Sequence, residues 1–267
     1  MTLAFNYLGR MGRLANQMFQ YASLKGIAKH HGYDYMISYH PDAVDDGIGN
    51  MLRTELFDSF DLKVRTGILK APVIRERQHN FDQELFDTCP DNVVLQGFFQ
   101  TEKYFKNIED QIRKDFIFKS QILEPCKEMM RQMNFPIALH IRRGDYVNNI
   151  DNHPLCTLEY YENALKHFDD NRQVIIFSDD PTWCKEQELF SDDRFMISEN
   201  EDNRIDLCLM SLCSDFIIAN SSFSWWGAWL STNKDKKVIA PRQWFGTGGY
   251  TKDCNTKDVV PQEWNRI

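Results

Sequence analysis

The chain has 267 residues, of which 42% are hydrophobic and 13% aromatic, which is enough for a packed core in one large domain or two modest ones. Its formal net charge of −8 argues against nucleic acid as a partner, because binding the phosphate backbone needs a concentrated basic surface. Any phosphate site in this protein must therefore be local.

The seven cysteines form neither a C-x-x-C pair nor a zinc-type cluster with histidine, so we expect reduced core thiols and no metal. The first 13 residues lack the basic start and apolar core of a signal peptide, and no window approaches the roughly 18 uninterrupted apolar residues of a membrane span. We therefore expect a cytoplasmic protein and leave open a peripheral association with the inner face of the plasma membrane.

The first half of the chain carries strand and helix patterns without regular alternation. We expect it to form an N-terminal α/β domain over residues 1–134, with the boundary in the polar helical segment 120–134. Residues 41–79 show no legible motif. The predicted strands are 3–8, 33–38 and 92–99, and the predicted helices are 16–31 and 101–116.

The second half alternates short apolar strands with amphipathic helices, which is the pattern of a parallel, doubly wound sheet. We expect a C-terminal, ligand-binding domain over 135–267, whose last residues could pack back on the first domain. The predicted strands are 137–141, 173–178, 195–198, 215–220 and 237–241, and the predicted helices are 157–168, 181–190, 204–213 and 222–231.

Polar side chains follow three of these strands directly. In an open parallel sheet, ligands bind outside the carboxyl ends of the strands, so these clusters should line one site. The clusters are His140 to Asp145, Ser178 to Asp180, and Asn220 to Ser222.

Arg142 and Arg143 lie at the end of the apolar strand 137–141. Arginine has a planar, permanently charged fork that binds phosphate oxygens in a bidentate way, so this pair indicates a phosphorylated ligand. The alternative is that the two arginines only form ion pairs with acidic neighbours, as most arginines do.

Asn220, Ser221 and Ser222 open a predicted helix, whose free N–H groups and positive dipole end favour an anion such as phosphate. The plainer alternative is that Asn220 or Ser221 only caps the helix. We assign Trp225 and Trp226 in that helix to packing.

Asp179 and Asp180 invite a metal hypothesis, but adjacent carboxylates at a strand end point in different directions, and no D-x-D triplet is present. Asp180 precedes Pro181 and is expected to cap a helix. A carboxylate here could instead accept hydrogen bonds from the edge of guanine or from ribose hydroxyls.

Gly9 and Gly12 can supply a tight turn between the first predicted strand and helix, from which Arg10 and Arg13 could reach a diphosphate. The pattern is not G-x-G-x-x-G, so a dinucleotide fingerprint is not supported. We group Asn16 with these two arginines as a candidate donor-binding residue.

Five segments that occur in order along the chain together resemble the bacterial α-1,2-fucosyltransferases. The short H-x-R-R-x-D element is shared with α-1,6- and protein O-fucosyltransferases, whereas the first and last segments are specific to the α-1,2 group. The segments are GRLANQMFQYA (12–22), LQGFFQTEKYF (95–105), HIRRGDYV (140–147), FSDDPTWC (177–184) and NSSFSWWGAWL (220–230).

The resemblance implies a GT-B-like fold of two Rossmann-like domains facing a cleft, the first on the acceptor side and the second binding GDP-fucose. It implies transfer from GDP-β-L-fucose with inversion, without a metal or other cofactor, to the 2-hydroxyl of a terminal galactoside in a bacterial glycan. Arg142 would hold the diphosphate, His140 and an acidic residue of 177–180 would lie near the nucleoside, and Ser221 and Ser222 near the phosphate. The family usually has glycine where this chain has Ala15, and a positive φ there would strain alanine.

The residues alone agree with this mechanism, because the negative charge that develops on the departing GDP must be met by arginine forks and a helix N-terminus. Asp145 could accept the proton of the acceptor hydroxyl, or could orient Arg142 and Arg143. Two alternatives stay open: a transferase that uses another GDP-sugar, and a non-catalytic nucleotide- or glycan-binding protein on the same fold. The acceptor and the oligomeric state are not encoded in any legible motif.

Overall fold

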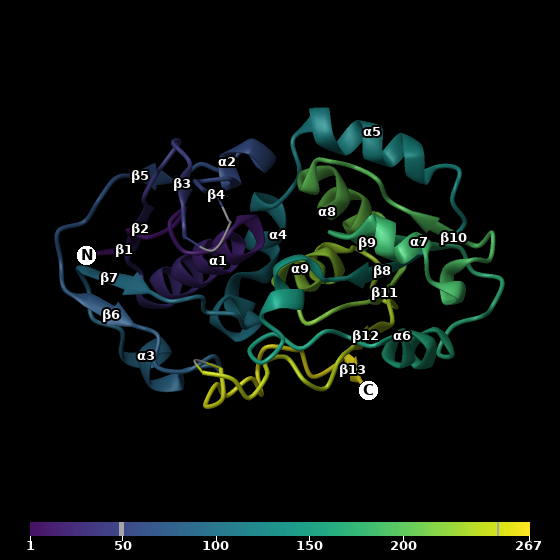
Figure 1. Cartoon of the computed structure of the whole chain (residues 1–267). Helices are drawn as coiled ribbons and strands as arrows, with labels where there is room; N and C mark the ends of the chain where they lie inside the picture. The colour runs from purple at the N-terminus through teal and green to yellow at the C-terminus, as the bar shows by residue number, and fades with distance from the viewer. Residues whose placement is uncertain (48–50, 250) are drawn as a thin grey trace. The chain divides into compact units, whose positions relative to one another are not determined.

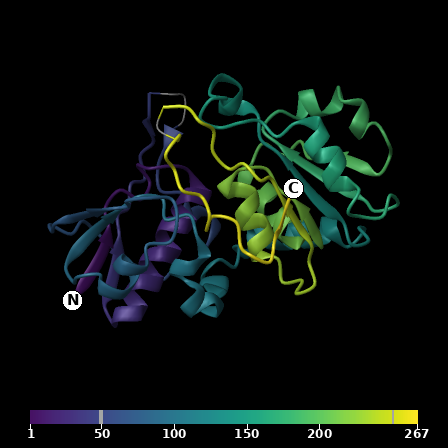
Figure 2. The same ribbon diagram turned by 90° about the horizontal axis from the view of Figure 1, so that it is seen from below.

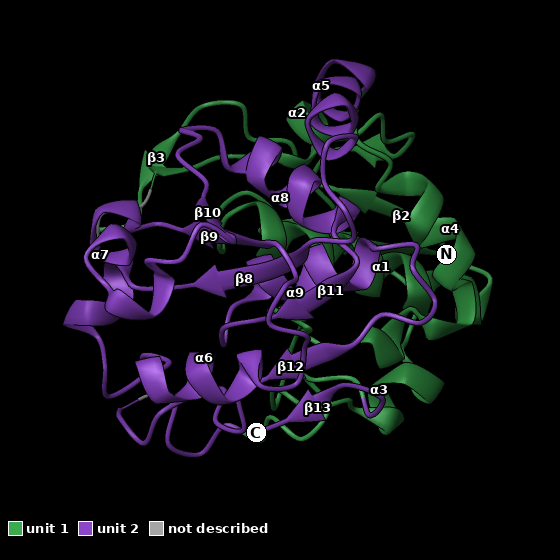
Figure 3. Cartoon of the chain, turned by 90° about the vertical axis from the view of Figure 1, so that its right-hand side faces the viewer, with its two compact units in different colours: residues 1–119, 255–261 green, residues 120–254, 262–267 purple. Residues whose placement is uncertain are grey.

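Each of two structural units is built from two stretches of the chain (Figures 1 and 3). The structure is a computed structural model that describes residues 1–47, 51–249 and 251–267. The chain begins in unit 1 and ends in unit 2 (Figure 2). Unit 1 comprises residues 1–119 and 255–261, and unit 2 comprises residues 120–254 and 262–267.

The change from unit 1 to unit 2 after Lys119 comes ahead of the expected boundary at Asn134. Helix α5 (Ser120–Met130) packs on α8 (Asn203–Leu212), and its Cys126 is buried there. Because α5 covers a helix of unit 2 with its apolar side, it belongs to that unit, although its sequence is as polar as a linker.

The return of residues 255–261 to unit 1 depends on Asp258. Its carboxylate accepts a hydrogen bond from the backbone N–H of Phe81 at 3.1 Å and pairs with Lys103 at 2.6 Å. Residues 262–267 then rejoin unit 2, where β13 (Asn265–Arg266) pairs with β12 (Val238–Ala240).

Unit 1 has a five-stranded parallel sheet of order β5-β2-β1-β7-β6. The turn from β1 into α1 uses Gly9 and Gly12 at φ +82° and +79°, a backbone region that favours glycine. A hairpin pairs β3 with β4. The elements are β1 (Thr2–Phe5), α1 (Leu14–His31), β2 (Asp34–Ile37), β3 (Val44–Asp45), β4 (Met51–Leu52), α2 (Leu56–Ser59), β5 (Arg65–Thr66), β6 (Val73–Arg75), α3 (Gln83–Thr88), β7 (Val93–Gln96) and α4 (Glu109–Asp115).

The prediction of one helix over 101–116 is wrong. The segment forms two 3₁₀ turns, Glu102–Tyr104 and Lys106–Ile108, before α4 begins. The backbone leaves helical geometry at Phe105, where φ is −131°. The backbone of Tyr104 and Phe105 lies so close to Gly26 of α1 that a Cβ on Gly26 would collide with it. Contact with a neighbouring helix has therefore overridden the local helical preference.

Ala15 lies in the first turn of α1 and is not strained. The non-glycine residues with positive φ in the described parts of the chain are Asn92, Phe99 and Phe135. Alanine therefore fits where the family usually has glycine.

Unit 2 has a six-stranded, all-parallel sheet of order β10-β9-β8-β11-β12-β13, as the alternating pattern predicts. No helix in the described part of the chain has the length and apolar character needed to span a lipid bilayer. The remaining elements of unit 2 are β8 (Ile137–Ile141), α6 (Leu158–Leu165), β9 (Val174–Ser178), α7 (Pro181–Lys185), β10 (Phe195–Ile197), β11 (Asp215–Ile217) and α9 (Ser222–Leu230).

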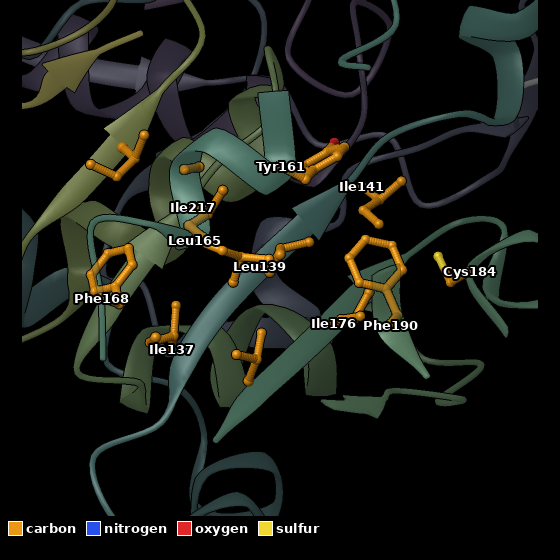
Figure 4. Packing of buried hydrophobic residues seen from close by; sticks show 13 residues of the cluster. Ile137, Leu139, Ile141, Tyr161, Leu165, Phe168, Ile176, Cys184, Phe190 and Ile217 are labelled. Atoms are coloured by element: carbon orange, nitrogen blue, oxygen red, sulfur yellow. The ribbon is translucent and has the colours of Figure 1, made fainter. Parts of the chain in front are cut away.

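The central strand β8 is buried on both faces, and four of its five residues are apolar. Successive side chains of a strand point to opposite faces. Leu139 packs with Tyr161 and Leu165 of α6 (Figure 4), whereas His140 meets Phe223 of α9, with ring centres 5.6 Å apart. The one polar residue of this strand therefore points to the face covered by α9.

Candidate functional site

The polar ends of β9, β8 and β11 lie at one edge of the unit 2 sheet. These three strands are neighbours and run parallel, with Ile141 paired to Ser178 and Leu139 paired to Ile217. The residues that follow each strand are thus brought to the same edge, as the pattern of the sequence predicts.

Arg142 is held at this edge by two carboxylates. Its Nη2 lies 2.5 Å from Oδ1 of Asp145, and its Nη1 lies 2.8 Å from Oδ2 of Asp179. The guanidinium carbon also lies 5.3 Å from the centre of the Tyr146 ring. Burial opposes the charge of Arg142, but the two carboxylates outweigh it and raise the pKa, so the guanidinium stays charged and oriented.

Arg143 is held by the next acidic residue and by an aromatic ring. Its Nε donates to Oδ2 of Asp180 at 2.9 Å, and its guanidinium stacks over Trp183 at 4.1 Å. Asp180 also caps α7 by accepting from the N–H of Trp183 at 3.1 Å, as expected. Cation–π contact and ion pairing together fix the position of the second guanidinium.

Asp179 joins the two arginines. Besides binding Arg142, it accepts a hydrogen bond from the backbone N–H of Arg143 at 2.8 Å. Gly144 leaves room for it, because a Cβ at that position would collide with Oδ2 of Asp179. Both arginines therefore form ion pairs with acidic neighbours, which was one of the two expected roles. They also place two fixed positive charges at consecutive positions after β8.

His140 is 5% exposed, and burial together with the charge of Arg142 lowers its pKa to about 3. The ring is therefore neutral at neutral pH and cannot supply a positive charge to a phosphate. Its Nδ1 has no hydrogen-bond partner among the described residues. The expected place of His140 near the nucleoside stays a prediction.

This lowered pKa predicts a loss of stability in acid. Between the unfolded pKa near 6.5 and the folded pKa near 3, the unfolded chain binds one more proton than the folded chain, so stability falls as the pH falls. When the pH falls from 7 to 5, we expect the free energy of unfolding of wild type to decrease by about 2 kcal/mol more than that of His140→Gln. Urea unfolding at the two pH values measures this difference. Equal acid losses in the two proteins would show that His140 is not responsible.

Asn220 organises the loops around the site. Its side-chain amide donates to the backbone carbonyl oxygens of Pro154 and Trp244, each at 3.0 Å. The backbone carbonyl oxygen of Asn220 accepts a hydrogen bond from the Tyr146 hydroxyl at 3.0 Å. Ser221 caps α9 by accepting from the N–H of Phe223 at 3.3 Å, the plainer of the two expected roles.

Ser222 is the first residue of α9 and is half-buried. The N-terminus of this nine-residue helix lies at the same edge as the two arginines, because β11 leads directly into it. Trp225 and Trp226 are fully buried, which confirms their assignment to packing.

Arg10, Arg13 and Asn16 lie in unit 1, apart in the chain from the cluster just described. Arg10 donates to the carbonyl oxygens of Asp42 and Leu52, at 3.0 and 2.7 Å, and so ties the β3–β4 hairpin to the turn that contains it. This contact gives Arg10 a structural role whether or not it also binds a ligand.

The start of α1 is occupied by an acidic side chain. Glu55 accepts from the N–H of Leu14 at 3.0 Å and lies 3.9 Å from Arg13, which is 53% exposed. Asn16 accepts from Gln100 at 2.8 Å. A role for Arg10, Arg13 and Asn16 in donor binding stays a prediction.

Asp206 on α8 is a further acidic residue at this sheet edge that sequence reasoning missed. It is 8% exposed, and its Oδ1 accepts from Ser198 at 2.6 Å and from Asn200 at 2.9 Å, just beyond β10. Burial raises its pKa, against the effect of these hydrogen bonds. The feature of the sequence that could have drawn attention to Asp206 is that it is an isolated aspartate in the apolar helical segment 204–213.

No group of three or more His, Cys, Asp or Glu side chains within residues 1–47, 51–249 and 251–267 is arranged to hold a metal ion. The seven cysteines, all within the described residues, form no disulfide with one another, and five of them are buried. The charged side chains that the structure brings together at the edge of the unit 2 sheet are arginines and carboxylates.

Residues 5–267 match the sequence profile of glycosyl transferase family 11. The chain is 32% identical to an alpha-1,2-colitosyltransferase of Escherichia coli over 96% of each chain. It is 35% identical to the O-antigen biosynthesis glycosyltransferase WbnK of Escherichia coli, over 59% of this chain and 57% of that one. It is 24% identical to galactoside alpha-(1,2)-fucosyltransferase 2 of Bos taurus, over 84% of this chain and 68% of the relative.

Solved structures with the same fold include POFUT1 in complex with GDP, with a TM-score of 0.54 and 12% identity, covering 89% of this chain and 97% of that one. NodZ alpha-1,6-fucosyltransferase soaked with GDP-fucose has a TM-score of 0.52 and 12% identity, covering 86% and 92%. At these identities the likeness concerns the fold alone. It confirms the expected GT-B class for a chain with two parallel α/β sheets.

Proposed function

The chain belongs to glycosyl transferase family 11, and we propose that it moves L-fucose from GDP-β-L-fucose to the 2-hydroxyl of a terminal galactoside in a bacterial glycan. The reaction proceeds with inversion at the anomeric carbon and without a metal ion. Arg142 carries this proposal. Its guanidinium is charged, is held by two carboxylates and stands beside a second arginine at the edge where parallel sheets bind ligands.

The geometry of Arg142 suits a diphosphate leaving group. One N–H of Nη1 and one of Nη2 are directed to carboxylates, and guanidinium has five N–H donors, so others can bind phosphate oxygens. Preorganised donors that need not move during the reaction stabilise the charge that develops on the β-phosphate. The N-terminus of α9 adds a favourable dipole at the same edge.

Asp206 is our candidate for selection of the base. Asp179 and Asp180 are committed to the arginines, whereas Asp206 uses Oδ1 for its neighbours, so Oδ2 can accept from the N–H edge of guanine. A buried carboxylate oxygen that lacks a hydrogen-bond donor costs free energy. A nucleotide whose nucleobase has no such N–H edge would therefore bind more weakly than GDP.

A second donor, GDP-colitose, is favoured by the relative named as an alpha-1,2-colitosyltransferase, which matches almost the whole chain. Colitose lacks the 3-hydroxyl of L-fucose, and both sugars would leave GDP on the same arginine cluster. The two donors are therefore distinguished by contacts to the sugar rather than to the nucleotide.

The proposal is tested by incubating the protein with GDP-fucose, GDP-colitose, GDP-mannose or UDP-galactose and with lactose or N-acetyllactosamine as acceptors. We expect an α-1,2-linked fucosyl product, identified by NMR, and no transfer from UDP-galactose. Transfer from GDP-colitose alone would replace the donor in our proposal. Binding of GDP without transfer or hydrolysis of any GDP-sugar would favour the non-catalytic alternative.

The same assay in excess EDTA tests independence from metals. We expect turnover to persist within about twofold, because arginine forks can neutralise the diphosphate that a metal would otherwise bind. Complete loss on chelation, restored by one specific divalent ion, would contradict this part of the proposal.

A further inference from the structure

An inverting transfer needs a group that accepts the proton of the acceptor hydroxyl, and the carboxylates that follow β8 and β9 are already committed. Asp145 and Asp179 bind Arg142, and Asp180 binds Arg143. To accept a proton, each of these carboxylates would have to give up an ion pair with its arginine.

His140 is a poor proton acceptor for a different reason. It is almost fully buried, and its pKa of about 3 lies far below the pH at which a base works efficiently.

A second imidazole, that of His153, belongs to the same cluster. The residue is partly buried and its Nδ1 is fully buried, so Nε2 is the nitrogen that would take up a proton. Its ring stacks on Tyr146, with centres 4.6 Å apart and planes 20° from parallel. The guanidinium carbon of Arg142 lies 5.3 Å from the centre of the same Tyr146 ring. His153 is therefore one aromatic ring away from the arginine that we assign to the leaving group.

The backbone on both sides of His153 is held in place. The carbonyl oxygens of Asp151 and Asn152 accept from the N–H groups of Gly248 and Gly246, at 2.7 and 2.8 Å. A Cβ on Gly246 would collide with the Asp151 carbonyl, so only glycine allows this close approach.

On the other side of His153, Pro154 accepts from Asn220 at 3.0 Å, and Phe245 meets the His153 ring edge-on at 5.5 Å. Such anchoring suits a group that must keep a precise geometry.

The electrostatic surroundings of His153 favour a neutral ring. Burial lowers its pKa, Asp145 acts in the opposite direction, and Arg142 lowers it again. The other ionisable groups nearby are the Tyr146 hydroxyl, whose pKa burial raises, and the exposed Asp151 on its own segment. At neutral pH the imidazole can therefore accept a proton.

We propose that His153 is the general base of the transfer reaction, an assignment that rests on the proposed function. Its imidazole takes the proton of the acceptor 2-hydroxyl while the bond from that oxygen to C1 of the donor sugar forms. The bond from C1 to the β-phosphate oxygen breaks, and its electron pair leaves with GDP. The imidazolium then gives its proton to water.

The test compares His153→Phe, which keeps a ring between Tyr146 and Phe245, with His153→Gln and with the control His167→Gln at an exposed site. We expect turnover with GDP-fucose and a galactoside to fall by about 10²–10⁴ in both His153 variants. GDP affinity measured by calorimetry should stay within about twofold. The acidic limb of the wild-type pH profile, with a midpoint below about 6.5, should disappear.

Turnover within about threefold of wild type in both His153 variants, or an unchanged acidic limb, would overturn the assignment. Weakened GDP affinity in both variants would also overturn it, because it would make His153 a positioning residue. If wild type transfers no sugar from any GDP donor, the proposed function fails and this inference fails with it. Wild-type transfer with unaffected variants overturns the inference alone.

Discussion

Replacing Arg142 by lysine is expected to lower transfer turnover by about 10²–10³-fold, the cost of removing one preorganised donor from a developing anion. Lysine keeps the positive charge but has a compact ammonium in place of a planar fork. An ammonium cannot bind Asp145 and Asp179 at 2.5 and 2.8 Å and also present two parallel N–H groups to a diphosphate. The loss therefore reports on geometry rather than charge.

The matched control is Arg131→Lys, at a side chain that is 71% exposed and outside the site. We expect it to keep near-wild-type turnover. Thermal unfolding of both variants should lie within a few degrees of wild type, because the Arg131 ion pair is open to solvent and lysine at position 142 keeps a positive charge beside Asp145 and Asp179. Near-wild-type turnover of Arg142→Lys with GDP-fucose would remove Arg142 from the donor site.

The core of unit 2 could be predicted from the sequence because its strands are buried on both faces. A strand such as β8, with all five residues buried, is apolar at four of its five positions, and the charged residues that follow Ile141 mark its end. Parallel topology then places Arg142, Asp179 and Asn220 at one edge without further information. The polar clusters of the site could therefore be predicted from the sequence.

Unit 1 was less predictable because its elements depend on contacts between distant residues. The strands β5 and β6 have two and three residues, too short for a period-two pattern. The break at Phe105 depends on the approach of Gly26, and the return of residues 255–261 depends on Asp258. Local propensity contains none of this information.

Within the site, the types of residue were predictable but their pairing was not. The resemblance puts an acidic residue of 177–180 near the nucleoside, which stays a prediction. The structure pairs Asp179 with Arg142 and Asp180 with Arg143. His153 gave no signal, because a lone histidine in a loop most often has no chemical role. The hypothesis for His153 arises from its stack on Tyr146, seven positions earlier in the 3₁₀ helix Gly144–Asn148, a contact that the sequence alone does not show.

Replacing Asp145 by asparagine separates its two possible roles. The 2.5 Å contact with Arg142 makes Asp145 an orienting group in our interpretation, and asparagine keeps its size but loses the charge that holds the guanidinium. We expect GDP affinity to weaken by about tenfold, or about 1.4 kcal/mol, a modest value because the pair is partly open to solvent. Turnover should fall with it, and both are measured on the same protein by calorimetry and by transfer from GDP-fucose.

Asp169→Asn, at an exposed position on the same unit, removes the same charge away from the site and should leave both quantities unchanged. The decisive comparison is therefore between affinity and turnover in Asp145→Asn. A base that only accepts the acceptor proton would lose turnover while GDP binds as tightly as before. Unchanged GDP affinity with turnover abolished would make Asp145 the base and would leave His153 without that role, because one acceptor hydroxyl gives up one proton.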